Sequence, residues 1–145
     1  MIYLGSDHAG FYLKQAIKKF LDSKNLKYQD LGGFSTKKPD DYPDYAEVVA
    51  KAVVKNKDNR GILICGTGTG MVIAANKIKG VRASVVYDAY TAKMSRKDND
   101  SNIMCLGARD KPHSVNTLLN VWLKTLFSNK PRHKRRIEKI KKLEK

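Results

Sequence analysis

Residues 61–70 read Gly-Ile-Leu-Ile-Cys-Gly-Thr-Gly-Thr-Gly, and the run Met-Val-Ile-Ala-Ala-Asn follows at 71–76. The apolar first half lacks the polar alternation of a half-exposed strand, so it indicates a strand that is covered on both faces. The alternating glycines then allow a sharp turn into the helical run. Residues 61–76 therefore predict a buried strand, a tight glycine loop and a helix.

Four more short apolar runs flank this strand, at 2–5, 28–31, 83–86 and 103–106. Longer segments of helical period separate the runs. In two of these segments the apolar positions form a one-sided stripe: Leu13, Ile17, Phe20 and Leu21, and then Val48, Val49, Ala52 and Val53. This alternation is typical of crossover helices, so we predict an α/β fold with a five-stranded parallel sheet and helices on both faces.

Two helices are predicted after the last strand. The first runs from about His113 to Phe127, with one apolar face made by Val115, Leu118, Leu119, Trp122 and Leu126. Pro131 starts the second, in which Ile137, Ile140 and Leu143 recur every three residues. Because a disordered polycation would not need this stripe, we expect the basic helix at about 131–145 to dock on a partner surface. We expect one domain over residues 1–145.

The chain is strongly basic. Its 145 residues hold 29 Lys+Arg and 14 Asp+Glu, a formal net charge of +15, and residues 129–145 alone hold nine Lys/Arg and two Glu. Such an excess attracts polyanions in general and does not separate nucleic acid from sugar phosphate. Aromatic residues make up only 8%, and none lies in the basic helix to stack on bases. A nucleic-acid-binding module stays open as an alternative.

The cysteines and the N-terminal residues indicate the cellular compartment of the protein. Cys65 and Cys105 each lie in an apolar run, which suits a reducing compartment. No apolar stretch approaches the ~20 residues of a membrane span, and Met1 opens into an apolar run with no charged leader. We expect a cytoplasmic protein. The histidines and cysteines show no metal-ligand spacing, so we expect no metal and no cofactor.

Polar and glycine-rich loops follow the predicted strands, at 6–8, 32–33, 66–70, 87–88 and 107–109. The carboxyl ends of parallel strands lie at one edge of a sheet, so these loops predict a single cleft. Converging amides at 66–70 predict an anion site, and Cys65 beside a helix N-terminus is placed to act as base or nucleophile. A turn without a ligand, and a small buried side chain at Cys65, are the alternatives.

Ordered blocks along nearly the whole chain resemble one family. They lie at 5–10 (GSDHAG), 41–46 (DYPDYA), 61–70, 74–77 (AANK), 99–102 (NDSN), 106–109 (LGAR) and 132–136 (RHKRR). The chain resembles the type B ribose-5-phosphate isomerases, which share a family with the subunits of galactose-6-phosphate isomerase. The resemblance implies a Rossmann-like, doubly wound α/β fold with a C-terminal helical extension, and a homodimer or dimer of dimers with shared active sites.

The resemblance also implies an activity, a metal-free aldose–ketose isomerisation between ribose 5-phosphate and ribulose 5-phosphate. Cys65 would be the base that moves a proton between C2 and C1, and the amides at 66–70 would hold the enediolate. Catalytic roles are implied for Cys65, Thr67 and Asp98. Substrate contacts are implied for Asp7, His8, Tyr42, Gly66, Thr67, Gly68, Thr69 and Gly70, and, from the neighbouring subunit, Asn99, Arg109, Arg132 and Arg136.

Two positions depart from the family pattern. Asp98 stands where a histidine usually opens the furanose ring, and an ordinary carboxylate is a poor proton donor at neutral pH. Either Asp98 is itself protonated, or Asp7 or His8 replaces it, or the substrate is already open. A 6-carbon substrate such as allose or galactose 6-phosphate, and a catalytically weakened sugar-phosphate binder, stay open. Lys130-Pro131 also stands where Gly-Gly is usual.

Simpler structural roles are expected at four other positions. His113 and His133 are predicted to cap or cover the surface. Tyr42, before Pro43, is predicted to lie in an extended loop. Cys105 is predicted to lie in the core.

Overall fold

The computed structural model describes residues 1–110 and 114–144, in which strands and helices alternate. In chain order the elements are β1 (Ile2–Ser6), α1 (Phe11–Ser23), β2 (Tyr28–Asp30), α2 (Tyr42–Val53), β3 (Arg60–Cys65), α3 (Thr69–Ala75), β4 (Ala83–Val85), α4 (Ala89–Lys97), β5 (Ile103–Gly107), α5 (Val115–Lys124) and α6 (Pro131–Lys141). The five predicted strands are all present, each within about one residue of its predicted ends.

The strands form one parallel sheet in the order β2-β1-β3-β5-β4. From β1 the chain adds β2 on one side, and from β3 it adds β4 and β5 on the other side, with β5 placed between β3 and the edge strand β4. The strand order therefore reverses between these two strands, and ligands of such sheets bind beyond the carboxyl ends at this point. The predicted parallel sheet is confirmed.

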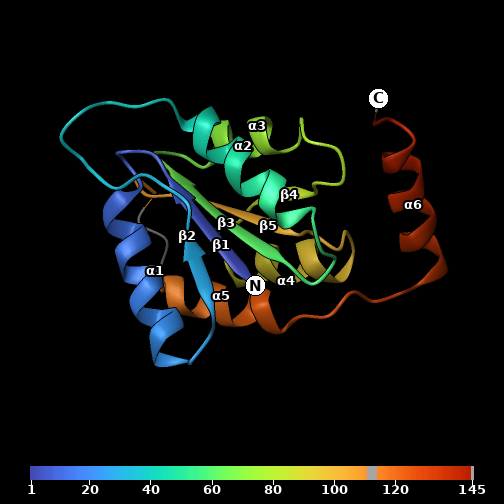
Figure 1. Cartoon of the computed structure of the whole chain (residues 1–145). Coiled ribbons are helices and arrows are strands. Elements are labelled where there is room, and N and C mark those ends of the chain that lie inside the picture. The colour runs from blue at the N-terminus through green and yellow to red at the C-terminus, as the bar shows by residue number, and fades with distance from the viewer. Residues whose placement is uncertain (111–113, 145) are drawn as a thin grey trace.

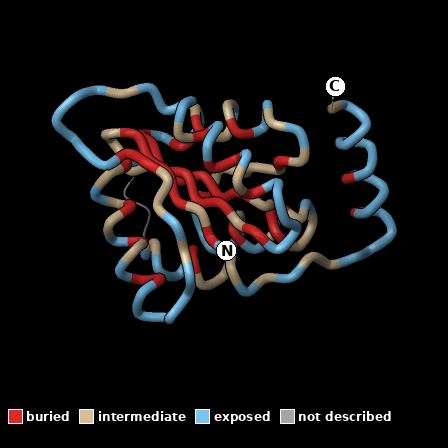
Figure 2. Tube along the Cα trace, viewed as in Figure 1, coloured by how far each residue is buried: buried red, intermediate tan, exposed pale blue. Residues whose placement is uncertain are grey.

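Two layers of helices cover the sheet (Figure 1). One core joins the sheet to α1, α4 and α5, and the other joins it to α2 and α3. The side chains of β3 alternate between these cores: Ile62 and Ile64 pack in the first, and Leu63 and Cys65 in the second. Figure 2 shows the buried residues concentrated in the sheet between the layers. Cys105 is fully buried, as predicted, and burial raises the pKa of its thiol.

A buried lysine on α1 fixes the loop that follows β2. Lys14 is fully buried, and its Nζ donates to Asp30 Oδ1 at 2.7 Å and to the carbonyls of Gly32 and Gly33. Burial lowers the pKa of Lys14, and the hydrogen bond to Asp30 opposes that effect. Lys18 reaches the other oxygen of Asp30 at 3.2 Å and is more exposed. The lysine thus holds a glycine turn beside the carboxyl end of β1.

We expect Lys14→Met to lower the free energy of unfolding by about 3–5 kcal/mol, because it leaves a mostly buried carboxylate and two carbonyls without this donor. Urea unfolding measures the effect. Lys18→Met is the matched control, and loss of this more exposed partner is expected to cost at most about 1 kcal/mol. Equal effects of the two substitutions would contradict the assigned role of Lys14.

Two details of the predicted helices were wrong. The helix predicted over 113–127 ends at Lys124, because Thr125 is extended with φ −74° and ψ 125°, and Leu126 is 81% exposed. Its predicted start at His113 lies outside the described residues. On α2, Val48 is exposed, and the buried positions are Ala46, Val49, Ala50 and Val53. The small alanines on this face let α2 lie close to the sheet.

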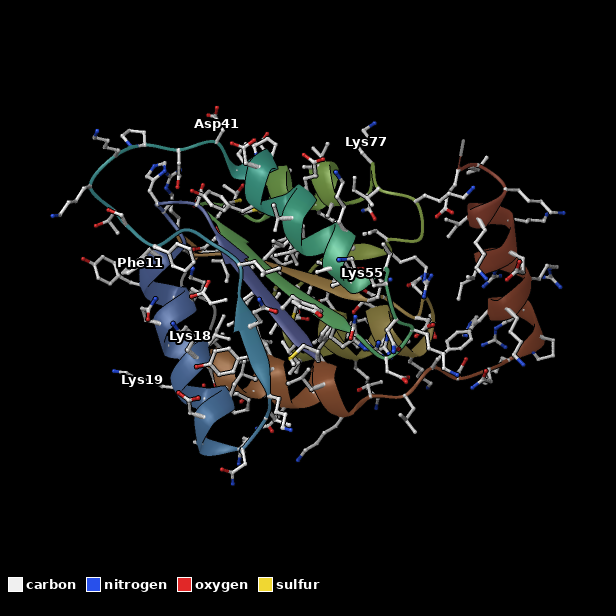
Figure 3. All side chains as sticks on the ribbon, viewed as in Figure 1. Phe11, Lys18, Lys19, Asp41, Lys55 and Lys77 are labelled. Atoms are coloured by element: carbon white, nitrogen blue, oxygen red, sulfur yellow. The ribbon has the colours of Figure 1, made fainter. Side chains whose placement is uncertain are left out.

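The C-terminal helix α6 stands beside the body on the side away from α1 (Figure 1). Ile137 is buried, but Ile140 is 41% exposed and Leu143 is 79% exposed, so two of the three residues of the predicted apolar stripe are uncovered in the single chain. Within the described ranges, no helix is long and apolar enough to cross a bilayer. Basic side chains such as Lys19 and Lys77 project from the body (Figure 3).

Candidate functional site

The glycine loop joins β3 to α3 at the point where the strand order reverses. Gly68 has φ +79°, a conformation that favours glycine, and its N–H donates to Cys65 Sγ at 3.1 Å. The amides of Gly66, Thr67 and Gly70 have no hydrogen-bond acceptor among the described residues. The loop therefore presents donors beside a thiol, as an anion site requires.

An arginine and a tyrosine flank this loop. A Cβ built on Gly66 would lie 2.8 Å from Arg109 Nη1, and one built on Gly70 would lie 2.6 Å from the ring of Tyr42. The resemblance implied that Arg109 comes from the neighbouring subunit, but here it lies against the loop of its own chain. The reason is topological, because Arg109 follows β5, the sheet neighbour of β3.

Asp7 and His8 follow β1 on the other side of the crevice. Asp7 is buried, and its Oδ1 accepts the N–H of Gly10 at 3.0 Å. His8 Nδ1 lies 2.8 Å from Asp40 Oδ1, and Asp40 Oδ2 accepts the hydroxyl of Tyr45 at 2.8 Å. Burial opposes ionisation of Asp40, but the hydrogen bonds from His8 and Tyr45 outweigh it and lower the pKa of Asp40. The imidazole is thus held in place by an ionised carboxylate.

Sequence reasoning missed Asp40 and Tyr45. Asp40 is separated from His8 by 32 residues, so only the folded chain shows that they pair. The same carboxylate raises the pKa of Tyr45 through their hydrogen bond. Tyr42 was also misplaced, because it is the first residue of α2 and not part of an extended loop. Asp41 is the extended N-cap, and Pro43 fits the first turn of a helix, where an N–H is not needed.

The remaining predicted site residues lie at the opposite edge of the sheet. Asp98 caps α4, and Asn99 follows it, before β5 begins. Arg132 and Arg136 are exposed on α6. His133, predicted at the surface, is instead buried, with its Nδ1 2.7 Å from Ser128 Oγ and 3.6 Å from Asp98 Oδ1. These contacts fasten the start of α6 beside the end of α4.

The single chain therefore divides the predicted site into two groups. The carboxyl edge of the sheet holds Asp7, His8, Tyr42, Cys65, residues 66–70 and Arg109. The amino edge and α6 hold Asp98, Asn99, Arg132 and Arg136. Among the described residues no group of three His, Cys, Asp or Glu side chains is arranged to hold a metal ion.

The fold and the residues at the carboxyl edge define an α/β protein. Its thiol, glycine loop and arginine lie where the strand order of the sheet reverses. The chain belongs to the ribose/galactose isomerase family, whose model matches residues 2–140.

Individual relatives match over nearly the full length. The chain is 44% identical to the probable ribose-5-phosphate isomerase B of Mycoplasma genitalium and 40% identical to the ribose-5-phosphate isomerase B of Escherichia coli; each match covers 99% of this chain and 95% of the relative. The crystal structure of ribose-5-phosphate isomerase B from Mycoplasma genitalium with bound ribulose-5-phosphate superposes with a TM-score of 0.92, at 42% identity, over 99% of this chain and 95% of that chain.

Proposed function

We propose that this chain is an aldose–ketose isomerase that interconverts ribose 5-phosphate and ribulose 5-phosphate, with Cys65 as the base. The observation that carries the proposal is the contact of Cys65 with the glycine loop at the switch point, in a chain that matches ribose-5-phosphate isomerases end to end. Both cysteines are unpaired, in keeping with a reducing cytoplasm.

The proposed reaction moves one proton between two carbons. The thiolate of Cys65 removes the proton from C2 of the open aldose, and the C1 carbonyl becomes the oxyanion of an enediolate. The proton on O2 passes to O1, the thiol of Cys65 returns its proton to C1, and C2 becomes the carbonyl. The unpaired amides of Gly66, Thr67 and Gly70 are suited to the negative charge that develops in between. Cys65 is only 5% exposed, so these charges form in a site that largely excludes water.

A second copy of the chain is the proposed source of the phosphate contacts. Arg132 and Arg136 are suited to a phosphate, because the guanidinium fork matches its oxygens. They lie on α6, beyond the amino edge of the sheet, whereas Cys65 ends a strand at the carboxyl edge. Neither arginine can join Cys65 within one chain unless α6 leaves its place. In a dimer, the amino edge of one copy would complete the carboxyl edge of the other.

The surface beside α6 supports this assembly. A groove of about 690 Å³ lies between the end of α6 and residues 76–84, with Ile78, Val81, Ile140 and Leu143 among its lining residues. Asn99, one of the predicted trans residues, also lines this groove. The exposed residues Ile140 and Leu143 of the apolar stripe therefore border Asn99, a polar residue that the proposed site needs. A second copy seated here would bury the stripe and bring its glycine loop toward Asn99.

The substrate is tested with purified protein and three sugar phosphates. We expect ribose 5-phosphate to be converted to ribulose 5-phosphate, followed by NMR, with kcat/KM at least about tenfold higher than for allose 6-phosphate or galactose 6-phosphate. A preference for a 6-carbon substrate would change the proposed substrate but would still support the proposed isomerase reaction. No conversion of any of the three at high enzyme concentration would remove the proposed function.

Asp98 is expected to limit ring opening. Asp98→His should raise kcat for ribose 5-phosphate by about tenfold or more, because a positioned general acid typically contributes ~10²–10⁴. Asp98→Asn is the matched control and should give no such rise, because the amide is not a proton donor of useful acidity. Equal rates for the wild type and Asp98→His would instead assign ring opening to another group, such as His8.

A further inference from the structure

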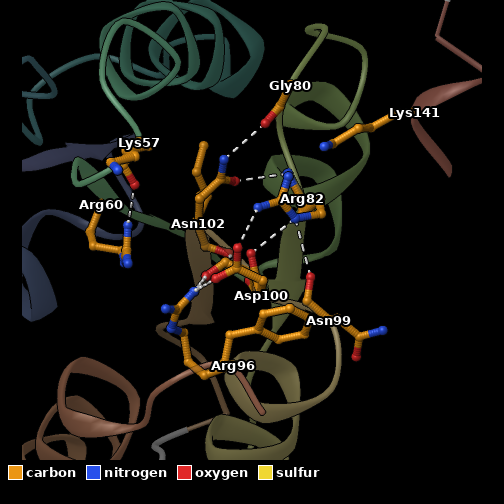
Figure 4. Close-up of polar contacts among 12 residues, drawn as sticks. Lys57, Arg60, Gly80, Arg82, Arg96, Asn99, Asp100, Asn102 and Lys141 are labelled. Atoms are coloured by element: carbon orange, nitrogen blue, oxygen red, sulfur yellow. Dashed lines mark hydrogen bonds and ion pairs between the residues drawn. The ribbon is translucent and has the colours of Figure 1, made fainter. Parts of the chain in front are cut away.

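A second cleft lies at the amino edge of the sheet, away from the glycine loop. It has a volume of about 350 Å³ and is lined by the end of α2, the start of β3 and the segments that precede β4 and β5. Its charged lining residues are Lys57, Arg60, Arg82, Asp100 and Lys141. Figure 4 shows Arg60 and Arg82 on either side of Asn102 and Asp100.

The one carboxylate of this cleft is already paired at both oxygens. Asp100 Oδ2 lies 3.0 Å from Arg82 Nη2, and Asp100 Oδ1 lies 2.8 Å from Nη1 of the buried Arg96. Lys141 is paired with Glu138 at 2.6 Å. Asp100 is therefore already shared between two arginines, and it forms no ion pair with Arg60 or Lys57.

Arg60 and Lys57 are the unmatched charges. Arg60 Nη1 donates to the backbone carbonyls of Lys57 at 3.0 Å and Asn59 at 2.8 Å. Neither Arg60 nor Lys57 has a carboxylate within ion-pair distance in the part of the chain that the structure describes. Burial, and then repulsion by Arg96, lower the pKa of Arg60. Asp100 and Asp58 oppose these effects from beyond ion-pair distance, and a bound anion would offset the remaining cost of burying this cation.

The guanidinium of Arg82 is preorganised to bind the same anion. Its Nε donates to the carbonyls of Asn99 at 3.1 Å and Asp100 at 3.0 Å, and its Nη2 contacts Asp100. The backbone N–H of Arg82 is fixed by Asn102 at 2.8 Å. The guanidinium is thus immobilised before any ligand arrives, which reduces the entropy lost on binding. Its Nη1 makes no hydrogen bond to the described residues.

We infer that this cleft binds a phosphate group, either as inorganic phosphate or as a small phosphomonoester. Guanidinium forks from Arg60 and Arg82, with Lys57 beside them, match the geometry and charge of a phosphate dianion. The volume is that of a small-molecule pocket, so a small phosphate fits better than a nucleic acid, which binds along an extended face. The cleft differs from the proposed catalytic site, because Cys65, Arg132 and Arg136 do not line it, although Arg82 also lines the neighbouring groove that holds Asn99.

The test measures phosphate binding in the full chain with the proposed catalytic phosphate contacts removed. Inorganic phosphate is titrated by calorimetry into the Arg132→Gln/Arg136→Gln protein, and we expect saturable binding to remain. Adding Arg60→Gln should weaken that binding by about tenfold or more, as expected for hydrogen bonds to a charged group. Lys57→Gln should weaken it less. Lys55→Gln, an exposed lysine that does not line the cleft (Figure 3), should leave it unchanged.

The outcomes are distinct. Absence of saturable binding, or equal weakening by Arg60→Gln and Lys55→Gln, would overturn the proposed site. Any phosphate binding would then be due to the general positive charge of the surface. If Arg60→Gln does not fold, Lys57→Gln against Lys55→Gln decides the same question. Binding of a single-stranded RNA that depends on Arg60 while inorganic phosphate does not bind also overturns it. Titration with adenosine monophosphate separates the two sources: tighter binding than inorganic phosphate indicates a phosphomonoester site, and equal binding indicates a site for free phosphate.

Discussion

Replacing Cys65 with alanine is expected to lower kcat for ribose 5-phosphate by a factor of ~10²–10⁴, the usual contribution of an acid–base group. KM should change little, because the thiol acts on the C2 proton while other groups bind the sugar and phosphate. The loop itself should persist, since glycine adopts the left-handed conformation of Gly68 at little cost even without a side-chain contact. Steady-state kinetics on the purified variant give both constants.

Cys105→Ala is the matched control for this substitution. Cys105 lies on the neighbouring strand β5, opposite Leu63, and is fully buried in the same core cluster as Cys65. Cys105→Ala makes the same side-chain change at a position away from the glycine loop. Its kcat should therefore stay within about twofold of the wild-type value. Retained turnover in Cys65→Ala would assign the base to another residue of the crevice and leave the family membership untouched.

The fold was largely predictable because its signals are local. The buried strand at 61–65 has no polar alternation, and the helical segments between the strands carry one-sided apolar stripes. The strand order was not predictable, because the placement of β5 between β3 and β4 depends on packing between distant segments. The apolar pattern was misleading at Leu126, because the helix ends at Lys124, two residues before the last apolar position of the predicted face.

The sequence predicts a set of candidate site residues, but it does not predict how the folded chain arranges them. The position of Cys65 before three glycines is a local feature, whereas the Asp40 carboxylate that orients His8 comes from a loop 32 residues away. The buried position of His133, between Ser128 and Asp98, likewise depends on how α6 returns to the end of α4. One chain alone does not bring Cys65 and Arg132 together, which makes the assembly part of the mechanism to be tested.

A mixing experiment tests whether two chains share each site. Cys65→Ala and the Arg132→Gln/Arg136→Gln double variant should each lose almost all turnover, the first through the lost base and the second through the lost phosphate contacts. Each chain nevertheless keeps the half of the site that the other lacks. The two proteins are unfolded together at equal concentration, refolded and assayed beside each variant refolded alone, so that refolding losses are matched.

We expect the mixture to recover about a quarter of the turnover of wild-type protein refolded in parallel, since random pairing of a twofold dimer makes half of the dimers mixed and each mixed dimer has one intact site of two. The intact site pairs Cys65 from the double variant with Arg132 and Arg136 from the Cys65→Ala chain. If the arginines instead swung across to the thiol of their own chain, no site in any mixed dimer would be complete. Turnover in the mixture would then stay at the level of the separate variants, even though gel filtration showed that mixed dimers had formed.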